Sequence, residues 1–500
     1  MSVTVETRYG RIRGTAERGV QVYRGVPFAE PPLGPLRFRA PLPPRPWRGV
    51  LDCHSFGAPA PQNAPRRPSL CDPAPVSWSE DCLTLNVFTP RQDGAPRPVL
   101  VWVHGGDFVE GRASEPGLTG RALARRGDLV VVTLQYRLGA LGFLDLGAVE
   151  DGRPGPANLG LLDQVAALEW VRDEIDAFGG DPSNVTVFGT CAGAACAAAL
   201  AAMPRARGLF RRAILQSPVL HVWDRAQGAE VGRAFLRELD PTPAGIAELE
   251  EVPTPLLLAA QQRCEGNLAS AAEGWVFRPV VDGEVLPSAA LSAMAAGEAP
   301  GIPLIVGTNL DEAHLAGAED PSSLWLSEAQ LLQRCRAVVA PERARLLIDT
   351  YRATRLGEAA SPGSLWAAME SDRLFRHPAM RLAELRAARG ESVFAYLFRW
   401  PSPVAGGALG AFRGLEVPFV FGTGRHHALR RFVGGGEEAK ELSHRMSDSW
   451  IEFARSGDPS CPGAGRWPAY AAPERRTLSL GTKPEVVDAP LEAERSFWDG

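Results

Sequence analysis

The 500-residue chain lacks several features that would assign it to a common class of protein. No apolar run reaches the length of a transmembrane helix, and the polar, strand-like N-terminus has no apolar segment typical of a secretory signal. The eight cysteines show no zinc-ligand spacing, and no internal repeat is visible. These absences favour a soluble cytoplasmic protein with free thiols and without a metal or another cofactor.

The sequence also lacks a large excess of positive or negative charge. The net charge is −5, so the composition gives no reason to expect a nucleic acid or an anionic membrane as partner. Short basic clusters such as Arg430-Arg431 are interpreted as solvated surface. Hydrophobic residues make up 45% of the chain, which is enough for a large core. We expect a monomer or a homodimer that acts on a small molecule.

Strand and helix patterns alternate along the sequence. Apolar runs such as Val99–Val103 and residues 129 to 136 are continuous, which is typical of strands covered on both faces. Residues 158 to 178 carry an apolar stripe with helical spacing and end at two glycines. The segment Val3–Phe28 alternates in polarity between glycines and predicts a meander of antiparallel strands.

This alternation predicts an α/β fold, with one mostly parallel sheet and helices on both of its faces. We expect residues 1 to 500 to form a single domain. Residues 224 to 300 and 315 to 390 look helical and irregular, and we interpret them as insertions that form a cap over the carboxyl edge of the sheet.

The chain is organised around residues 184 to 200. Asn184–Phe188 predicts a buried strand, and the Ala-rich run after Gly193 predicts a helix. The tight turn between them, Gly189-Thr190-Cys191-Ala192-Gly193, has glycines where the backbone must pack closely. Strand, sharp turn and helix in this order are typical of a nucleophile elbow, and Cys191 stands at its apex.

Eight further segments, in one order along nearly the whole chain, resemble a known family. They are Tyr23–Phe38, Ser79–Val87, His104–Phe108, Tyr136–Gly139, Phe178–Thr186, Gly307–Glu312, Glu416–Gly422 and Phe453–Pro459. The sequence is similar to the type-B carboxylesterases, the family of the bacterial para-nitrobenzyl esterases and the cholinesterases. The resemblance implies an α/β-hydrolase fold.

The resemblance also places the family's catalytic groups on unusual residue types. The elbow nucleophile, normally Ser, is Cys191, and the position of the family's His base is held by Arg413. The residue after the His-Gly-Gly of the oxyanion loop, normally Gly or Ala, is Asp107. The acid is retained as Glu312. Three of the positions that perform ester hydrolysis therefore differ together, which indicates an altered catalytic triad.

These residue types restrict the chemistry. A thiol, with an ordinary pKa of about 8.5, depends less on a base than a hydroxyl does. Arg413 cannot accept a proton, but it can favour a nearby thiolate or form an ion pair with Glu312. Asp107, if it points inward, would repel an oxyanion or act as a general base in place of the missing His. If it points to solvent or at Arg413, it would do little harm to an oxyanion.

The remaining candidates are assigned through the resemblance. The N–H groups of Gly106, Asp107 and Ala192 would form the oxyanion hole. His221 or His314 could replace the lost base. His104 would have a structural role, packed within the oxyanion motif. Six residues are expected at the substrate pocket, namely Phe108, Ser217, His221, Trp223, His314 and Leu315. In many relatives the cysteine matching Cys82 forms a disulfide; the position of its usual partner is Ala60 here, and Cys53 or Cys71 could take its place.

Three functions remain open. The first is a carboxylesterase-family enzyme turned from plain hydrolysis to cyclisation, isomerisation, elimination or acyl transfer on a small organic molecule, such as a natural-product intermediate. The second is a cysteine-dependent esterase or thioesterase that works through a thioester on Cys191. The third is a small-molecule-binding protein without catalysis.

Overall fold

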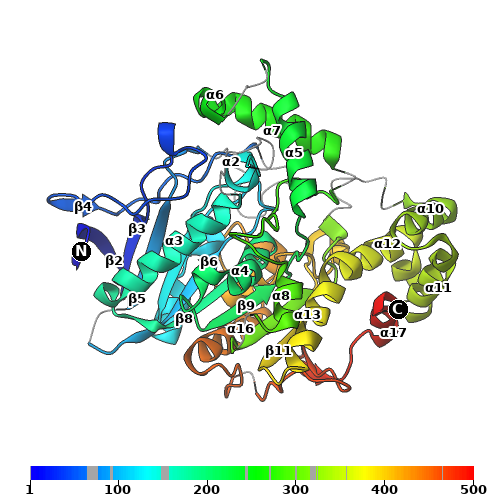
Figure 1. Cartoon of the computed structure of the whole chain (residues 1–500). Coiled ribbons are helices and arrows are strands. Elements are labelled where there is room, and N and C mark those ends of the chain that lie inside the picture. Colours follow the sequence, from blue (N-terminus) through cyan, green and yellow to red (C-terminus); the bar gives the residue numbers. More distant parts are fainter. Residues whose placement is uncertain are drawn as a thin grey trace.

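The computed structural model describes residues 2–64, 77–90, 94–147, 157–241, 246–269, 272–298, 301–315, 323, 325–355, 357–463 and 465–499. A large sheet runs through the molecule (Figure 1). Its strands are β1 (Ser2–Thr7), β2 (Gly10–Glu17), β3 (Val20–Pro27), β4 (Val50–Asp52), β5 (Thr84–Pro90), β6 (Arg97–Val103), β7 (Val130–Leu134), β8 (Gly180–Thr190), β9 (Arg212–Gln216), β10 (Leu304–Asn309), β11 (Val393–Phe398), β12 (Thr477–Leu480) and β13 (Glu485–Val487).

The strands are arranged in the order β1-β2-β3-β5-β7-β6-β8-β9-β10-β11-β12-β13, and β4 pairs with β2. All neighbours from β7 to β12 in this order are parallel. The N-terminal strands β1, β2, β3 and β5 pair antiparallel, and so does β13 at the other edge. The predicted mostly parallel sheet and the predicted N-terminal meander are therefore confirmed.

The central strands are buried on both faces, as their continuous apolar runs predict. On β6, Val99, Val101 and Val103 contact one hydrophobic core, while Leu100 and Trp102 contact the other. Side chains of a strand point alternately to opposite faces, so an apolar residue at every position requires cover on both sides.

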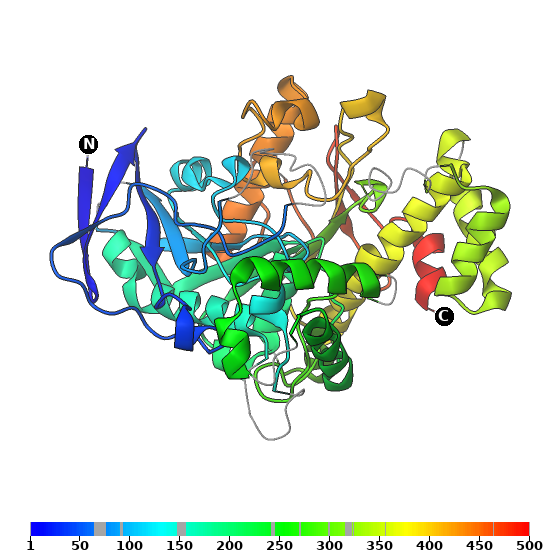
Figure 2. The same cartoon turned by 90° about the horizontal axis from the view of Figure 1, so that it is seen from above.

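That cover comes from helices on each side of the sheet (Figures 1 and 2). Residues of α3, α4, α8 and α13 belong to the first core, and residues of α1, α14 and α16 belong to the second. The helices are α1 (Arg121–Gly127), α2 (Gly139–Phe143), α3 (Leu159–Glu174), α4 (Ala192–Ala202), α5 (Arg225–Arg237), α6 (Ile246–Glu251), α7 (Thr254–Leu268), α8 (Ala290–Ala296), α10 (Glu328–Val338), α11 (Ala344–Thr354), α12 (Pro362–Ser371), α13 (His377–Ala387), α14 (Val417–Val420), α15 (Arg430–Val433), α16 (Glu437–Ser456) and α17 (Glu492–Asp499).

Two groups of helices stand away from these layers. Helices α5, α6 and α7 lie together at the top of Figure 1. Helices α10, α11 and α12 form a third core with α17 at the side of the molecule that holds the C-terminus, opposite the N-terminal strands (Figure 2). Helix α8 lies in the predicted insertion 224–300, yet it packs against α4 and α13. The single domain and its division into body and cap stay predictions.

Among the described residues, none of the helices combines the length and the apolar character that a membrane crossing requires.

Candidate active site

The strand, turn and helix predicted around Cys191 are present. Cys191 follows β8 and directly precedes α4, with φ 52° and ψ −118°. Its N–H donates to the Gln216 carbonyl at 2.9 Å, which ties the turn to the end of β9. A Cβ at Gly193 would lie 2.1 Å from the Val103 carbonyl oxygen, and one at Gly189 would lie 2.6 Å from the Gly193 carbonyl carbon. Glycine is therefore required on both sides of the apex.

Asp107 is the hydrogen-bond partner of the thiol. The Cys191 Sγ donates to Asp107 Oδ1 at 3.1 Å, and the indole Nε1 of Trp275 donates to the same oxygen at 3.0 Å. The Arg413 Nη2 lies 3.5 Å from the other oxygen, Oδ2. Asp107 thus points toward the apex of the elbow, and a cation and two donors surround its carboxylate.

The backbone of the loop after β6 turns Asp107 in this direction. Gly106, Asp107 and Phe108 have φ values of 114°, 53° and 65°. Two of these residues carry a Cβ, so the segment holds backbone strain of a kind that clusters at functional sites. A Cβ at Gly106 would lie 2.0 Å from the Glu110 carbonyl oxygen, so this position also requires glycine.

An aromatic wall supports Arg413 and Trp275. The Phe375 ring meets the Trp275 ring edge-on with centroids 5.9 Å apart, and the Arg413 guanidinium lies 5.3 Å from the Phe375 centroid. Phe375 belongs to a π-helical segment, Asp372–Arg376, between α12 and α13. Such π-helical segments are rare in proteins, and where they occur they often lie at functional sites.

The predicted ion pair between Arg413 and Glu312 is wrong. Arg413 lies between Phe375 and the Asp107 carboxylate, which supplies its counter-charge. Glu312 is 2% exposed, and its Oε1 accepts the N–H of Asn309 at 2.7 Å. Its Oε2 has no hydrogen-bond partner within the described part of the chain. Burial, and next the charge of Glu416, raise the pKa of Glu312 to about 8.

Glu416 is a second buried carboxyl group close to Glu312. Its Oε1 accepts from Thr190 Oγ1 at 3.2 Å and from Gln216 Nε2 at 3.0 Å, and its Oε2 accepts from Asn309 Nδ2 at 2.7 Å. Burial raises its pKa, while these donors lower it. The network joins the elbow strand to β9 and β10. Because two carboxyl groups sit in one buried network, the raised pKa of Glu312 follows from like-charge repulsion as well as desolvation.

The two histidines considered as replacement bases have carboxylate partners. The Nδ1 of His221 lies 3.2 Å from Glu273 Oε2, and burial lowers its pKa. The Nε2 of His314 lies 3.9 Å from Asp311 Oδ1. His104 stacks on Tyr136 with centroids 4.5 Å apart, and burial lowers its pKa to about 4. A buried, neutral imidazole is consistent with the structural role predicted for His104.

The other predicted pocket residues lie in different environments. Phe108 is fully buried and packs edge-on against Phe143 at 5.2 Å, in the core. Ser217 is buried close to Glu312. The indole of Trp223 donates to a backbone carbonyl, and the Arg278 guanidinium lies 3.5 Å above its ring. Leu315 packs against the second core. Their contact with substrate stays a prediction.

Gly106 and Asp107 lie on the loop after β6, and Ala192 is the first residue of α4. The oxyanion hole assigned to their N–H groups also stays a prediction. Cys53 and Cys82 are free buried thiols, and burial raises the pKa of Cys53 to about 12. Cys71 lies outside the described residues. The described residues contain no group of three or more His, Cys, Asp or Glu suited to hold a metal ion.

Sequence reasoning missed Trp275, Phe375 and Glu416 as members of this site. Glu416 stands in a segment that carries the family resemblance, so a signal for it was present. Trp275 and Phe375 lie in the regions interpreted as insertions, where no motif marked them. They reach Asp107 and Arg413 only through the tertiary fold.

The titration of Glu312 predicts a pH-dependent stability. The folded protein binds a proton on the Glu312 carboxylate more tightly than the unfolded chain does, with a pKa of about 8 against 4.5. Its contribution to the free energy of unfolding therefore falls as the pH rises from about 4.5 to about 8, by roughly 1 kcal/mol for each pH unit in that interval. We expect Glu312→Gln to flatten this fall in urea unfolding at pH 5 and pH 8. Substitution of the exposed Glu438 by Gln should leave it unchanged.

Comparisons with known proteins identify the family to which the chain is similar. The model of the carboxylesterase family matches residues 1–498. The chain is 39% identical over 495 residues to a para-nitrobenzyl esterase of Bacillus subtilis, covering 98% of this chain and 97% of that protein. It is 35% identical to a phenmedipham hydrolase of Pseudarthrobacter oxydans, covering 97% and 96%. The crystal structure of a Geobacillus stearothermophilus carboxylesterase superimposes with a TM-score of 0.88 and 38% identity, covering 99% of both chains.

The sheet and the elbow therefore define an α/β-hydrolase fold, as predicted. The chain belongs to the carboxylesterase family.

Proposed function

We propose that this protein is a carboxylesterase-family enzyme with an altered catalytic triad, which acts on a small organic molecule by non-hydrolytic chemistry based on proton transfer. The 3.1 Å hydrogen bond from the Cys191 thiol to the Asp107 carboxylate carries this proposal. It puts a carboxylate, the usual form of a general base, beside the position where the family resemblance expects a nucleophile. Isomerisation, elimination and cyclisation all need such a group.

The charges around the elbow disfavour ester hydrolysis. Attack on an ester generates an oxyanion, and hydrolases stabilise it with aimed N–H donors. Here the Asp107 carboxylate is directed at the apex of the elbow and would repel an anion there. Loss of the thiol proton would likewise place two negative charges within hydrogen-bond distance. The hydrogen bond from the thiol to Asp107 therefore favours the thiol over the thiolate while Asp107 carries a charge.

The raised pKa of the retained acid, Glu312, also supports the proposal. In a Ser-His-Asp triad the acid stays ionised and stabilises the imidazolium that forms during turnover. Glu312, with a pKa raised to about 8, is mostly protonated at neutral pH. Arg413, in place of an imidazole, pairs with Asp107 and can hold an anionic or carbonyl oxygen of the substrate. Trp275 and Arg413 keep Asp107 oriented as the proton acceptor.

A cysteine-dependent esterase is the second candidate, because Cys191 occupies the apex of the elbow. The names of the relatives, an esterase of para-nitrobenzyl compounds and a phenmedipham hydrolase, also point toward acyl chemistry. In this mechanism Asp107 would accept the thiol proton, and Arg413 would offset part of the resulting charge.

We expect hydrolysis of p-nitrophenyl acetate to be barely above the buffer rate. The physical reason is the carboxylate at the oxyanion loop together with the lack of an imidazole at position 413. Release of p-nitrophenol measured at pH 7 tests this directly. Turnover at rates ordinary for an esterase, or an acyl adduct on the Cys191 peptide in mass spectrometry, would establish the second candidate instead.

The proposed reaction class is tested by the mass of the product. Candidate lactones, esters and unsaturated carbonyl compounds are incubated with the wild type, Asp107→Asn and Cys191→Ala. We expect a product of unchanged mass or one lighter by a small leaving group, lost in Asp107→Asn and largely kept in Cys191→Ala. Net addition of water, seen as one heavier hydroxy acid from a lactone or as an acid and an alcohol from an ester, and lost in Cys191→Ala, would contradict the proposal.

A further inference from the structure

A groove away from the elbow is lined by several segments of the second helix layer. The groove is bounded by α1, by α14 with the loop after α14, by the glycines after α15 and by the first turns of α16. Its volume is about 620 Å³. The lining residues with charged side chains are Arg125, Arg126, Arg425, Arg430, Glu437 and Lys440, and His444 lies beside them. This volume lies within the range of sites that hold small molecules.

The groove carries an excess of positive charge. Arg126 forms two hydrogen bonds with Asp448, at 2.6 and 2.7 Å, and Lys440 pairs with Glu437 at 2.9 Å. The other three arginines of the lining, Arg125, Arg425 and Arg430, have no acidic partner within salt-bridge distance among the described residues. Burial, together with the nearby cations Arg126 and Lys440, lowers the pKa of His444.

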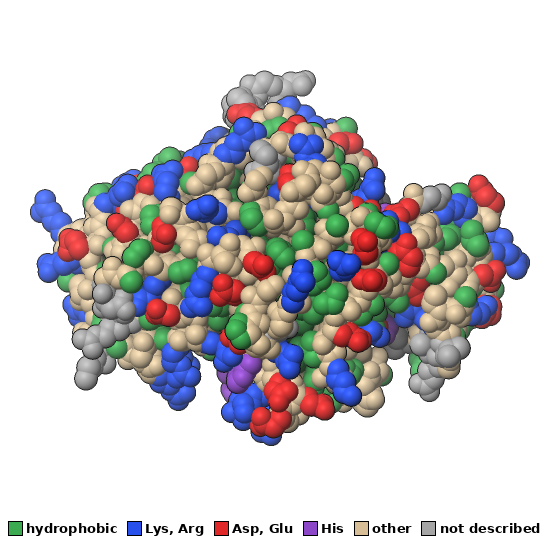
Figure 3. All heavy atoms as spheres, turned by 90° about the horizontal axis from the view of Figure 1, so that it is seen from below, with side chains coloured by type: hydrophobic (Ala, Val, Ile, Leu, Met, Phe, Trp, Pro, Cys, Tyr) green, Lys and Arg blue, Asp and Glu red, His purple; other side chains and the backbone are tan. Residues whose placement is uncertain are grey.

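Figure 3 shows how the charged side chains are distributed over one face of the molecule. Acidic and basic side chains are interspersed over the face in Figure 3, and at its lower edge blue and purple side chains lie beside a cluster of red ones. A mixed surface neutralises its own charge over short distances, so a binding site for anions requires cations that lack local partners.

The backbone at one end of the groove is glycine-rich and precedes a helix whose first turn carries Glu437 and Glu438. Gly434, Gly435 and Gly436 line the groove directly before α16, and Gly434 and Gly436 have φ values of 82° and 111°. The 20-residue helix α16 begins without a side-chain hydrogen bond at its N-cap. Backbone N–H groups at such a helix end, next to residues without side chains, are suited to phosphate oxygens.

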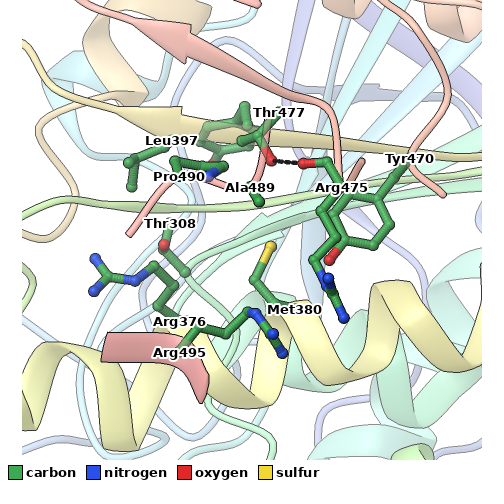
Figure 4. A pocket seen from close by; sticks show the side chains of 11 residues that line it. Thr308, Arg376, Met380, Leu397, Tyr470, Arg475, Thr477, Ala489, Pro490 and Arg495 are labelled. Atoms are coloured by element: carbon green, nitrogen blue, oxygen red, sulfur yellow. Dashed lines mark hydrogen bonds between the residues drawn. The ribbon is translucent and has the colours of Figure 1, made fainter. Parts of the chain in front are cut away.

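A second pocket of the molecule provides a contrast. It lies between α13 and strands β10 to β12, and Arg376, Arg475 and Arg495 stand around it (Figure 4). Each of these arginines has carboxylate partners, and the free space of about 20 Å³ is enough for roughly one water molecule. Three arginines around a cavity therefore do not by themselves make an anion site, and the groove differs in both size and unpaired charge.

We propose that the groove binds a small molecule that carries two or more phosphate groups and has the size of a nucleotide. Arg425 and Arg430, with Arg125, would contact the phosphates, and the glycines would let the phosphates approach the backbone. Guanidinium groups suit this ligand because their planar donors match phosphate oxygens in pairs. The proposal is independent of the reaction at Cys191.

Isothermal titration calorimetry of the full chain with sodium tripolyphosphate and with ATP tests the proposal. We expect binding in the micromolar to submillimolar range that weakens as sodium chloride is raised, because exposed charges are screened. The double variant Arg425→Gln/Arg430→Gln should bind at least about tenfold more weakly, as expected for the loss of two charge-assisted contacts.

The chain offers a matched control. Arg431 is next to Arg430, stacks over Phe432 at 4.5 Å and does not line the groove, so Arg431→Gln should bind like the wild type. Gly435→Ala provides a variant with unchanged charge: its Cβ would lie 4.0 Å from Arg430, and we expect weaker binding because the backbone is less accessible.

Three outcomes would overturn the proposal. The first is no heat of binding for either probe at millimolar concentration. The second is equal loss of affinity in Arg431→Gln and in the double variant, which would show unspecific attraction. The third is binding of a single-stranded RNA while tripolyphosphate and ATP fail to bind. The thermal unfolding midpoint of each variant shows whether the fold is retained.

Discussion

Alkylation of Cys191 by iodoacetamide is expected to be about ten- to a hundredfold faster in Asp107→Asn than in the wild type at pH 7. The substitution removes a negative charge whose oxygen lies 3.1 Å from the sulfur. It also leaves the Arg413 guanidinium without its carboxylate partner, so that its charge acts on the thiol. Both changes favour the reactive thiolate over the neutral thiol. Mass spectrometry of the modified peptide at several times measures the rate.

Two comparisons separate charge from structure in this experiment. Trp275→Phe removes one hydrogen bond to Asp107 and keeps its charge, so it should change the rate far less. The Cys461 thiol, which is partly exposed and distant in sequence, reports any general loosening of the fold. A rate in Asp107→Asn equal to that of the wild type would show that the carboxylate does not control the thiol. The assignment of Asp107 as the acid–base group would then lose its support.

The fold could be read from the sequence because its signals are local. The runs at Val99–Val103 and 129–136 are apolar at nearly every position, which only a strand covered on both faces requires. The glycines beside Cys191 likewise mark a turn whose Cβ atoms would collide with backbone. Strands β12 and β13, with four and three residues, are too short to give a periodic pattern, and no strand was predicted there.

The site could be read only in part, because its contacts depend on side-chain directions across the fold. The residue types at positions 107, 191 and 413 were visible, but their pairing was not. Either Glu312 or Asp107 could have been the carboxylate partner of Arg413. The expected partner, Glu312, is instead held by Asn309 in a buried network. The left-handed backbone at Asp107 directs its side chain to the apex and to Arg413. No pattern of residue types marks that conformation, and Trp275 reaches it from a separate segment.

The largest effect is expected from a variant that restores the residue types usual in the family, Cys191→Ser/Asp107→Gly/Arg413→His. A glycine adopts the φ of 53° at position 107 without strain and removes the anion from the oxyanion loop. A histidine at position 413 supplies a base for the serine, and its positive form would favour the ionised form of Glu312. We expect hydrolysis of p-nitrophenyl acetate to rise by about a thousandfold or more over the wild type.

The double variants are the controls for this restoration, because the members of a triad act as a unit. Cys191→Ser/Asp107→Gly lacks a base, and Cys191→Ser/Arg413→His keeps the carboxylate at the oxyanion loop, so each should remain within about tenfold of the wild type. Addition of Glu312→Gln to the triple variant should remove most of the gain, since the imidazolium would lose its counter-charge. A triple variant that is folded by circular dichroism yet hydrolyses no faster than the wild type would show that more of the site than these three positions has departed from ester hydrolysis. The aromatic wall of Trp275 and Phe375 would then be the next place to look, since it determines what can lie beside position 413.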